Sequence, residues 1–232
     1  MSSTPTVERY TTIELSEMSL DPTSTQTTFL GVSSGLYIFA LDVGTSSLPC
    51  LSNVRLSLPS LTPSDVALSK SANGLMHWSR TSNYCTVCGG RTSITNGGHE
   101  CYCPSCERSA FPRNDPAMIS LVTNVERSKV VLAHSPRHPD NLYSCLAGFV
   151  DIGEGFEDAV KREVMEEVGV DVTGVRYVKT ESWPFPQSFM GGFMAVGVER
   201  GEVVPQEEEI LDARWFGREE VREASLRGSS QK

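Results

Sequence analysis

One stretch decides the fold of the second half of this chain: residues 148–170 read GFVDIGEGFEDAVKREVMEEVGV. Its middle, 156–168, is predicted to be a helix. Acidic residues crowd the front of that segment, where the helix dipole favours negative charge, and Gly169 can end it. Three valines recur every four residues and form one buried stripe: Val160, Val164 and Val168.

Three glutamates lie in one sector of this helix beside the valine stripe: Glu163, Glu166 and Glu167. Such charges repel by about 0.2–0.5 kcal/mol per pair on an exposed helix, and a divalent cation reverses the sign of the interaction. Carboxylate oxygens suit magnesium or manganese, which would take further ligands from substrate phosphates. Arg162 can hold Glu166, four residues on. A solvated acidic face is the alternative, and the glycines within 148–155 weigh against it because they let a ligand approach the backbone.

The whole stretch satisfies the pattern G-x5-E-x7-R-E-U-x-E-E-x-G-U, where U is aliphatic, and resembles the Nudix box. The resemblance implies an α+β fold, an α/β/α Nudix sandwich with a mixed sheet, that hydrolyses a nucleoside diphosphate linked to another group. It also implies that Glu163, Glu166 and Glu167 are catalytic and hold magnesium or manganese. Glu166 or Glu167 would serve as, or orient, the base for the attacking water.

Four cysteines form two C-x2-C pairs: Cys85 with Cys88, and Cys103 with Cys106. Each pair presents two thiolates on a tight knuckle, and two knuckles complete a tetrahedral zinc site. A four-cysteine site has no open position, so we expect Zn²⁺ to fold a small ribbon rather than to act in chemistry. Cys101 is a rival ligand, but its C-x-C spacing makes a poorer knuckle and we interpret it as a spare thiol.

A second marker, WPFPQS at 183–188, resembles the S-Q-P-W-P-F-P-x-S signature of the NADH pyrophosphatase group of Nudix hydrolases, which also carries a zinc ribbon. A rigid polyproline loop is the alternative for these letters alone. The group's pattern places substrate contacts at Phe111, at Ala147 and on the loop Glu181–Ser188, and further metal contacts at Ala147 and Glu209. The loop residues are Glu181, Ser182, Trp183, Pro184, Phe185, Pro186, Gln187 and Ser188.

The chain departs from the group's pattern in three places. Glu181 places a carboxylate where the signature has an amide, which could repel phosphate. Phe111 replaces a tyrosine, so stacking survives but the phenolic hydrogen bond does not. Relatives usually continue past Trp215 and Phe216 into another helical stretch, whereas this chain stops at Lys232. We therefore keep a catalytically weak nucleotide-binding sensor as an alternative.

The expected function is metal-dependent hydrolysis of the pyrophosphate of NADH or NAD⁺ to AMP and nicotinamide mononucleotide, and by the same chemistry removal of the NAD cap from RNA. A Nudix hydrolase for ADP-ribose or a methylguanosine-type cap is the alternative within the enzyme class. The formal net charge of −9 argues against nucleic acid held by phosphate neutralisation alone. The family also implies a homodimer.

The chain divides into an N-terminal domain (1–80), a zinc ribbon (81–112) and a Nudix domain (113–232). The N-terminal domain is expected to be small and β-rich, with two strands in 28–42, a loop at 44–62 and a helix at 64–78 begun by Ser64 and Asp65. Strands are expected in the last domain, followed by a helix at 218–226. The predicted strands are 117–124, 128–134, 142–150, 175–181 and 189–198.

Composition narrows the class of protein. The 232 residues are 39% hydrophobic and 21% charged, as in globular proteins. No apolar run approaches the roughly 18 residues that a membrane-spanning helix needs. The acidic opening has neither a signal peptide nor a transit peptide pattern. We expect an intracellular, cytoplasmic location without a membrane, with peroxisomal or mitochondrial delivery as the alternatives.

Overall fold

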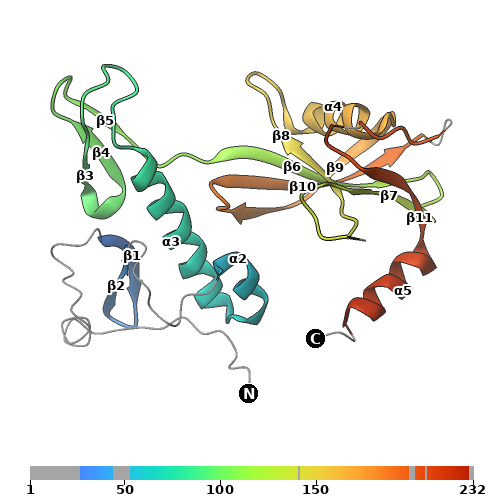
Figure 1. Ribbon diagram of the computed structural model, residues 1–232, viewed down its shortest axis with the longest axis horizontal. Coiled ribbons are helices and arrows are strands. Elements are labelled where there is room, and N and C mark those ends of the chain that lie inside the picture. Colours follow the sequence, from blue (N-terminus) through green and yellow to red (C-terminus); the bar gives the residue numbers. More distant parts are fainter. Residues whose placement is uncertain (1–26, 44–52, 141, 199–201, 207, 230–232) are drawn as a thin grey trace. The chain divides into compact units, whose positions relative to one another are not determined.

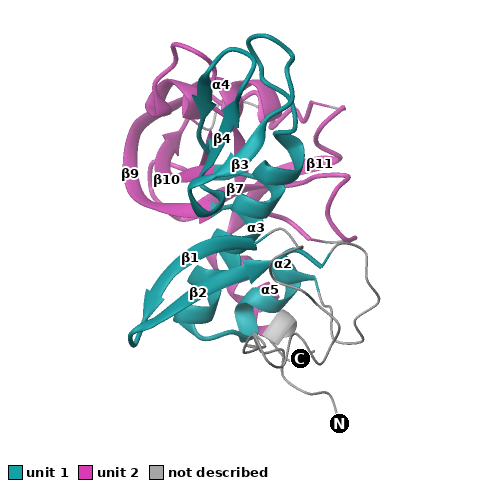
Figure 2. Ribbon diagram, turned by 90° about the vertical axis from the view of Figure 1, so that its left-hand side faces the viewer, with its two compact units in different colours: residues 1–114, 183–188 teal, residues 115–182, 189–232 magenta. Residues whose placement is uncertain are grey.

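The computed structural model describes residues 27–43, 53–140, 142–198, 202–206 and 208–229. The chain forms two compact units, coloured separately in Figure 2. Unit 1 consists of residues 1–114 with 183–188, and unit 2 of residues 115–182 with 189–232. The finer division of the first unit into an N-terminal domain and a ribbon stays a prediction.

Unit 1 begins with an antiparallel hairpin of β1 (Thr27–Ser33) and β2 (Leu36–Leu41) (Figure 1). Its turn residues Ser34 and Gly35 have φ of 52° and 77°. Two successive left-handed residues match the twist of a tight two-residue hairpin. The two strands predicted around this turn are confirmed.

Helices follow the hairpin: α2 (Val54–Ser57), the 3₁₀ turn η1 (Leu58–Ser60) and α3 (Pro63–Thr81). The helix predicted at 64–78 is confirmed, but its predicted start is wrong. Thr62 caps α3, because its Oγ1 accepts a hydrogen bond from the Asp65 N–H at 3.3 Å and Pro63 occupies the first helical position. The loop predicted at 44–62 is wrong over 54–60, and 44–52 lies outside the described residues.

An antiparallel ribbon completes unit 1. It is built from β3 (Ser93–Thr95), the 3₁₀ turn η2 (Asn96–Gly98), β4 (Glu100–Cys103) and β5 (Arg108–Ala110), with β4 in the middle.

Unit 2 is built on one sheet in the order β11-β7-β6-β10-β9, with β8 also paired to β6. The β11–β7, β7–β6 and β6–β8 pairs are antiparallel. Burial alternates along β10, which places one set of its side chains in the core. The strands are β6 (Asp115–Thr123), β7 (Lys129–His134), β8 (Leu146–Phe149), β9 (Val172–Trp183), β10 (Ser188–Gly197) and β11 (Asp212–Gly217).

The five predicted strands of this unit are confirmed with changed ends. The strand predicted from residue 142 starts only at Leu146, although Ser144 already bridges Ala133. Strand β11 was not predicted, because the charged side chains of Asp212 and Arg214 interrupt its apolar residues. Its pairing with β7 holds it in the sheet.

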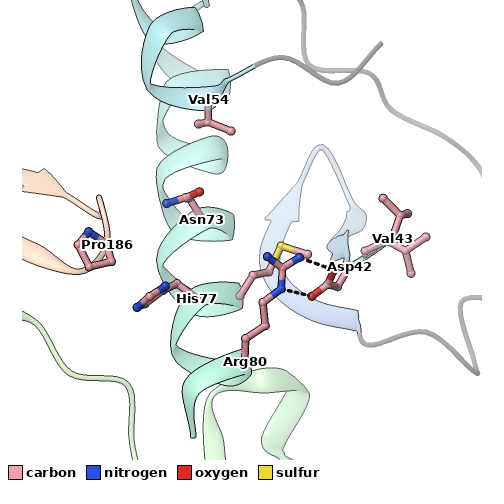
Figure 3. A pocket seen from close by; sticks show the side chains of 9 residues that line it. Asp42, Val43, Val54, Asn73, His77, Arg80 and Pro186 are labelled. Atoms are coloured by element: carbon pink, nitrogen blue, oxygen red, sulfur yellow. Dashed lines mark hydrogen bonds and ion pairs between the residues drawn. The ribbon is translucent and has the colours of Figure 1, made fainter. Parts of the chain in front are cut away.

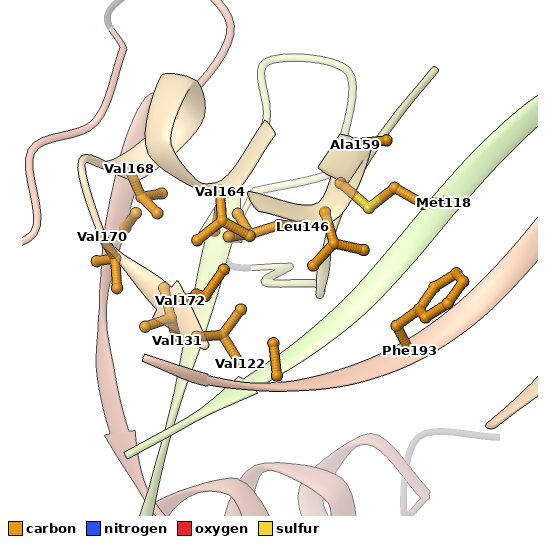
Figure 4. Close-up of a cluster of buried hydrophobic side chains, with 14 of the residues drawn as sticks. Met118, Val122, Val131, Leu146, Ala159, Val164, Val168, Val170, Val172 and Phe193 are labelled. Atoms are coloured by element: carbon orange, nitrogen blue, oxygen red, sulfur yellow. The ribbon is translucent and has the colours of Figure 1, made fainter. Parts of the chain in front are cut away.

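Helix α4 (Phe156–Val168) packs on β8 and β6. The predicted stripe of Val160, Val164 and Val168 is fully buried in the hydrophobic core. Figure 4 shows Val164 and Val168 of this stripe facing side chains of the sheet. Gly169 ends the helix with φ of 67°. These findings confirm the helix predicted at 156–168.

Helix α5 (Arg218–Ser229) begins directly after β11, where a helix was predicted. Its side chains over 218–226 are exposed except for the partly buried Val221. In the described ranges, no helix combines the length and the apolar character that crossing a membrane requires.

Candidate active site

Glu167 is the most buried of the glutamates that we predicted to bind metal in unit 2. Its exposed fraction is 7%. Its Oε2 atom is buried without a hydrogen-bond partner among the described residues. Burial, together with the negative charges of Glu163, Glu209 and Glu166, raises the pKa of Glu167 to about 8. A buried carboxylate without donors is costly unless a cation or a proton accompanies it.

The Glu163 carboxyl group lies against β8 at Gly148, where a larger residue would force it to move. A Cβ atom on Gly148 would stand 2.0 Å from the Glu163 Cδ and 2.2 and 2.3 Å from its two oxygens. Burial raises the pKa of Glu163, and the nearby Arg162 opposes that rise. The first glycine of the box therefore makes room for the Glu163 carboxylate, which we predicted to bind metal.

Arg162 is the centre of the network that holds these carboxylates. Its Nε and NH2 groups donate to the two oxygens of Glu154 at 2.9 and 2.8 Å. Its NH1 group donates to Glu163 at 3.0 Å and to Glu166 at 2.9 Å, which confirms the predicted contact with Glu166. NH2 also donates to the Phe149 carbonyl at 2.9 Å. The guanidinium lowers the pKa of Glu154.

Sequence reasoning assigned Glu154 only to the front of the helix and missed its pairing with Arg162. The signal for this pairing was the spacing of Glu154 and Arg162 inside the box pattern, which is as fixed as the spacing of Glu163, Glu166 and Glu167.

Glu209 approaches this cluster through a loop that pairs with the end of α4. The Val204 and Gln206 N–H groups donate to the Val168 and Glu167 carbonyls at 3.0 and 2.9 Å. The Glu209 charge raises the pKa of both Glu163 and Glu167, so Glu209 acts electrostatically on both carboxylates. The Glu209 side chain is exposed, and its neighbour at position 207 lies outside the described residues.

The predicted substrate residues divide between the two units. Ala147 lies exposed on β8 beside Gly148 in unit 2, whereas Phe111 is in unit 1 and 64% exposed. The predicted loop Glu181–Ser188 is wrong at its start, because β9 continues through Trp183. Its remaining part connects β9 to β10 and belongs to unit 1 from Trp183 to Ser188.

The four predicted zinc ligands converge in unit 1. The Sγ atoms of Cys85, Cys88, Cys103 and Cys106 all lie within 4.8 Å of one another. Hydrogen bonds from the backbone N–H groups of Cys88 and Val87 lower the pKa of Cys85 to about 6. Four converging thiols, one of them with its pKa lowered by backbone donors, fit a tetrahedral soft-metal site.

Cys101 lies outside this cluster. It is 1% exposed, its thiol donates to the Ser82 carbonyl at 3.6 Å, and burial raises its pKa. Among the described residues Cys101 is thus not part of the four-cysteine cluster, and its interpretation as a spare thiol stays a prediction.

Comparison with known proteins shows the family to which the second half of the chain is similar. Residues 113–232 match the NUDIX domain. The chain is 48% identical over 139 residues to the NAD-capped RNA hydrolase NudC of Pseudomonas aeruginosa, covering 60% of this chain and 49% of the relative. It is 39% identical over 168 residues to the NAD-capped RNA hydrolase NUDT12 of Homo sapiens, covering 69% and 36%. The chain thus spans about half the length of the bacterial relative.

A solved structure supports the fold. The crystal structure of a NUDIX hydrolase from Nitrosomonas europaea matches with a TM-score of 0.50 at 24% identity, covering 60% of this chain and 79% of that chain. The predicted Nudix sandwich is confirmed.

Proposed function

This chain belongs to the NUDIX family, and we propose that it hydrolyses the pyrophosphate bond of NADH and NAD⁺ to AMP and nicotinamide mononucleotide. By the same chemistry it removes the NAD cap from RNA. The observation that carries the proposal is the buried Oε2 atom of Glu167, which has no hydrogen-bond partner among the described residues and belongs to an acidic cluster on the box helix. The bacterial and human relatives named as NAD-capped RNA hydrolases support the choice of substrate.

The residues of the cluster fit a divalent cation. The donors are hard carboxylate oxygens, which suit Mg²⁺ or Mn²⁺. The Glu167 Oε2 atom has no hydrogen-bond partner in the described part of the chain, and Gly148 leaves room for the Glu163 carboxylate. Glu163, Glu166, Glu167 and Glu209 would hold the cation, and Ala147 has only its backbone carbonyl to offer. A bound cation would neutralise the diphosphate and lower the pKa of the attacking water.

The chain's own groups supply orientation and proton transfer. Arg162 holds Glu166 and Glu163 in place through one NH1 group while it is itself fixed by Glu154. Glu166 has a side chain that is 54% exposed, so it can meet a water molecule, whereas Glu167 is buried. We assign proton acceptance, or the orientation of the water that loses the proton, to one of these two glutamates.

The substrate-contact residues follow from the group resemblance. We propose that Phe111, Ala147 and residues 181–188 contact the dinucleotide, with Phe111 stacking on a ring. The cysteine cluster would bind Zn²⁺ as a structural ion that holds the ribbon together. We further propose that the protein forms a homodimer and that it works in a reducing, cytoplasmic compartment. Light scattering of the purified chain tests the oligomeric state.

One observation favours a second function. Glu181 has an exposed carboxylate where the group's signature has an amide, and it lies 3.8 Å from the Lys179 ammonium in an ion pair. We infer that this carboxylate slows turnover by repelling the substrate phosphate or alters the recognition of the nicotinamide. The second candidate is therefore a nucleotide sensor that binds with metal but turns over weakly, or a hydrolase for ADP-ribose.

The test is AMP release from NADH, NAD⁺, ADP-ribose and NAD-capped RNA, each with Mg²⁺ or Mn²⁺. We expect NADH or NAD⁺ to be the best small substrate and Glu167→Gln to lower its turnover by about 10²–10⁴. Faster turnover of ADP-ribose would overturn the proposed specificity. Metal-dependent nucleotide binding without AMP release, equal in wild type and Glu167→Gln, would establish the sensor.

A further inference from the structure

The segment that follows β9 is held by the helices α2 and α3. The Asn73 side-chain amide, in the middle of α3, donates a hydrogen bond to the Pro184 carbonyl. The two residues are 111 positions apart in the chain. Pro184 is buried and has no N–H of its own, so this carbonyl is the backbone group through which α3 reaches it.

The next residue of α3 brings the backbones close together. A Cβ atom on Gly74 would stand 3.1 Å from the Pro184 Cβ, which is tighter than an ordinary van der Waals contact. Glycine costs about 1 kcal/mol relative to alanine inside a helix. The close approach to Pro184 gives a reason for that cost.

Two further contacts hold the same segment. The Arg55 guanidinium of α2 lies over the Trp183 ring, 5.1 Å from its centroid, and the Trp183 and Phe185 rings meet edge to face at 5.3 Å. Pro186 lines a cavity together with His77 and Asn73 (Figure 3). In that view His77 extends from α3 toward the side on which Pro186 lies, whereas Arg80 turns to Asp42.

We infer that Asn73, Gly74 and Arg55 are positioning residues that fix the Trp183–Ser188 segment for recognition of the nicotinamide half of the substrate. The inference rests on the proposed function, because the substrate role of this segment does. The N-terminal helices thereby contribute to substrate selection without touching the diphosphate. They determine the position of the Pro184 backbone and the Trp183 ring, whereas the acidic cluster of α4 performs the chemistry.

The inference predicts an effect on selectivity rather than on chemistry. In Asn73→Ala the hydrogen bond to Pro184 is lost, and in Arg55→Ala the cation no longer covers the Trp183 ring. A single hydrogen bond of this kind corresponds to about a fivefold change in an equilibrium. We expect the ratio of kcat/KM for NADH to that for ADP-ribose to fall about fivefold in each variant, mainly through KM for NADH. Ser71→Ala, on the exposed side of α3, is the matched control and should leave the ratio unchanged.

Hydrogen–deuterium exchange of the full chain gives a readout that does not depend on activity. We expect faster exchange at the Phe185, Gln187 and Ser188 amides in Asn73→Ala and Arg55→Ala, and wild-type exchange in Ser71→Ala. Unchanged exchange in both variants, or an equal loss of activity on NADH and ADP-ribose, would overturn the inference. An inactive wild type would overturn the proposed function and the selectivity role with it, whereas the exchange rates would still show whether these contacts hold the segment. Arg55→Ala, on an exposed residue, keeps the test valid if Asn73→Ala fails to fold.

Discussion

Adding one methyl group at Gly148 is the sharpest test of the acidic cluster. In Gly148→Ala the new Cβ atom would lie 2.0 Å from the Glu163 Cδ and 2.2 Å from its nearer oxygen. Non-bonded carbon atoms lie about 3.5–4.0 Å apart. The Glu163 carboxyl group therefore has to move by about 1.5 Å or more. That movement also breaks the hydrogen bond of 3.0 Å from Arg162 to Glu163.

The size of the displacement sets the expected loss of activity. A misplacement of about 1 Å at a reacting centre can cost about 100-fold in rate. We expect AMP release from NADH to fall by about that factor in Gly148→Ala, and the affinity for Mn²⁺, followed by electron paramagnetic resonance, to fall with it. Manganese binding is measured separately because it reports on the carboxylates even where turnover is weak.

A second glycine provides the control. Gly217, at the end of β11, has no heavy atom within 4 Å of an added Cβ, and its backbone is not in the left-handed region. Gly217→Ala should keep both turnover and manganese affinity. If Gly148→Ala also kept both within about threefold while melting like the wild type, the assignment of Glu163 to the metal site would be refuted.

Three further outcomes are expected. Glu167→Gln should lower hydrolysis by about 10²–10⁴, and near-normal AMP release would contradict the catalytic assignment of Glu167. The metal-free variant should keep or raise its melting temperature, because a neutral amide is less costly to bury than a carboxylate without a partner. Arg162→Lys should lower activity about tenfold and lower the melting temperature, since an ammonium cannot donate to Glu154, Glu163 and Glu166 together. Wild-type values in both measurements would show that the guanidinium group is dispensable. Cys88→Ser should reduce both the zinc content, measured by atomic emission, and the melting temperature. The control variant Cys101→Ala should keep its full zinc content. Equal zinc content in the two variants would show that Cys88 is not a zinc ligand.

The box helix could be predicted from sequence alone because its information is local. A helix turns by a fixed angle per residue, so the spacing of Val160 and Val164 defines the buried face and places Glu163 and Glu167 beside it. The knuckles around Cys85 and Cys88 are local for the same reason, because two thiolates at that spacing face one another.

Other parts of the site needed the folded chain. Glu209 joins the acidic cluster only because the backbone before it pairs with the Glu167 and Val168 carbonyls at the end of α4. The contact between Gly148 and Glu163 depends on how closely α4 packs on β8. The distance between Gly148 and the Glu163 carboxyl group cannot be predicted from residue spacing or composition.

The sequence by itself determined which residues this protein can offer to a metal and a diphosphate: carboxylates on one helical turn, and thiolates on two knuckles. Only the tertiary structure decided how deeply Glu167 is buried and that Asn73 reaches Pro184. The physical reason is the sequence distance over which each kind of interaction acts. Helix and knuckle geometry follow from backbone dihedral angles over a few residues, whereas burial and contacts between distant residues depend on the packing of the whole unit.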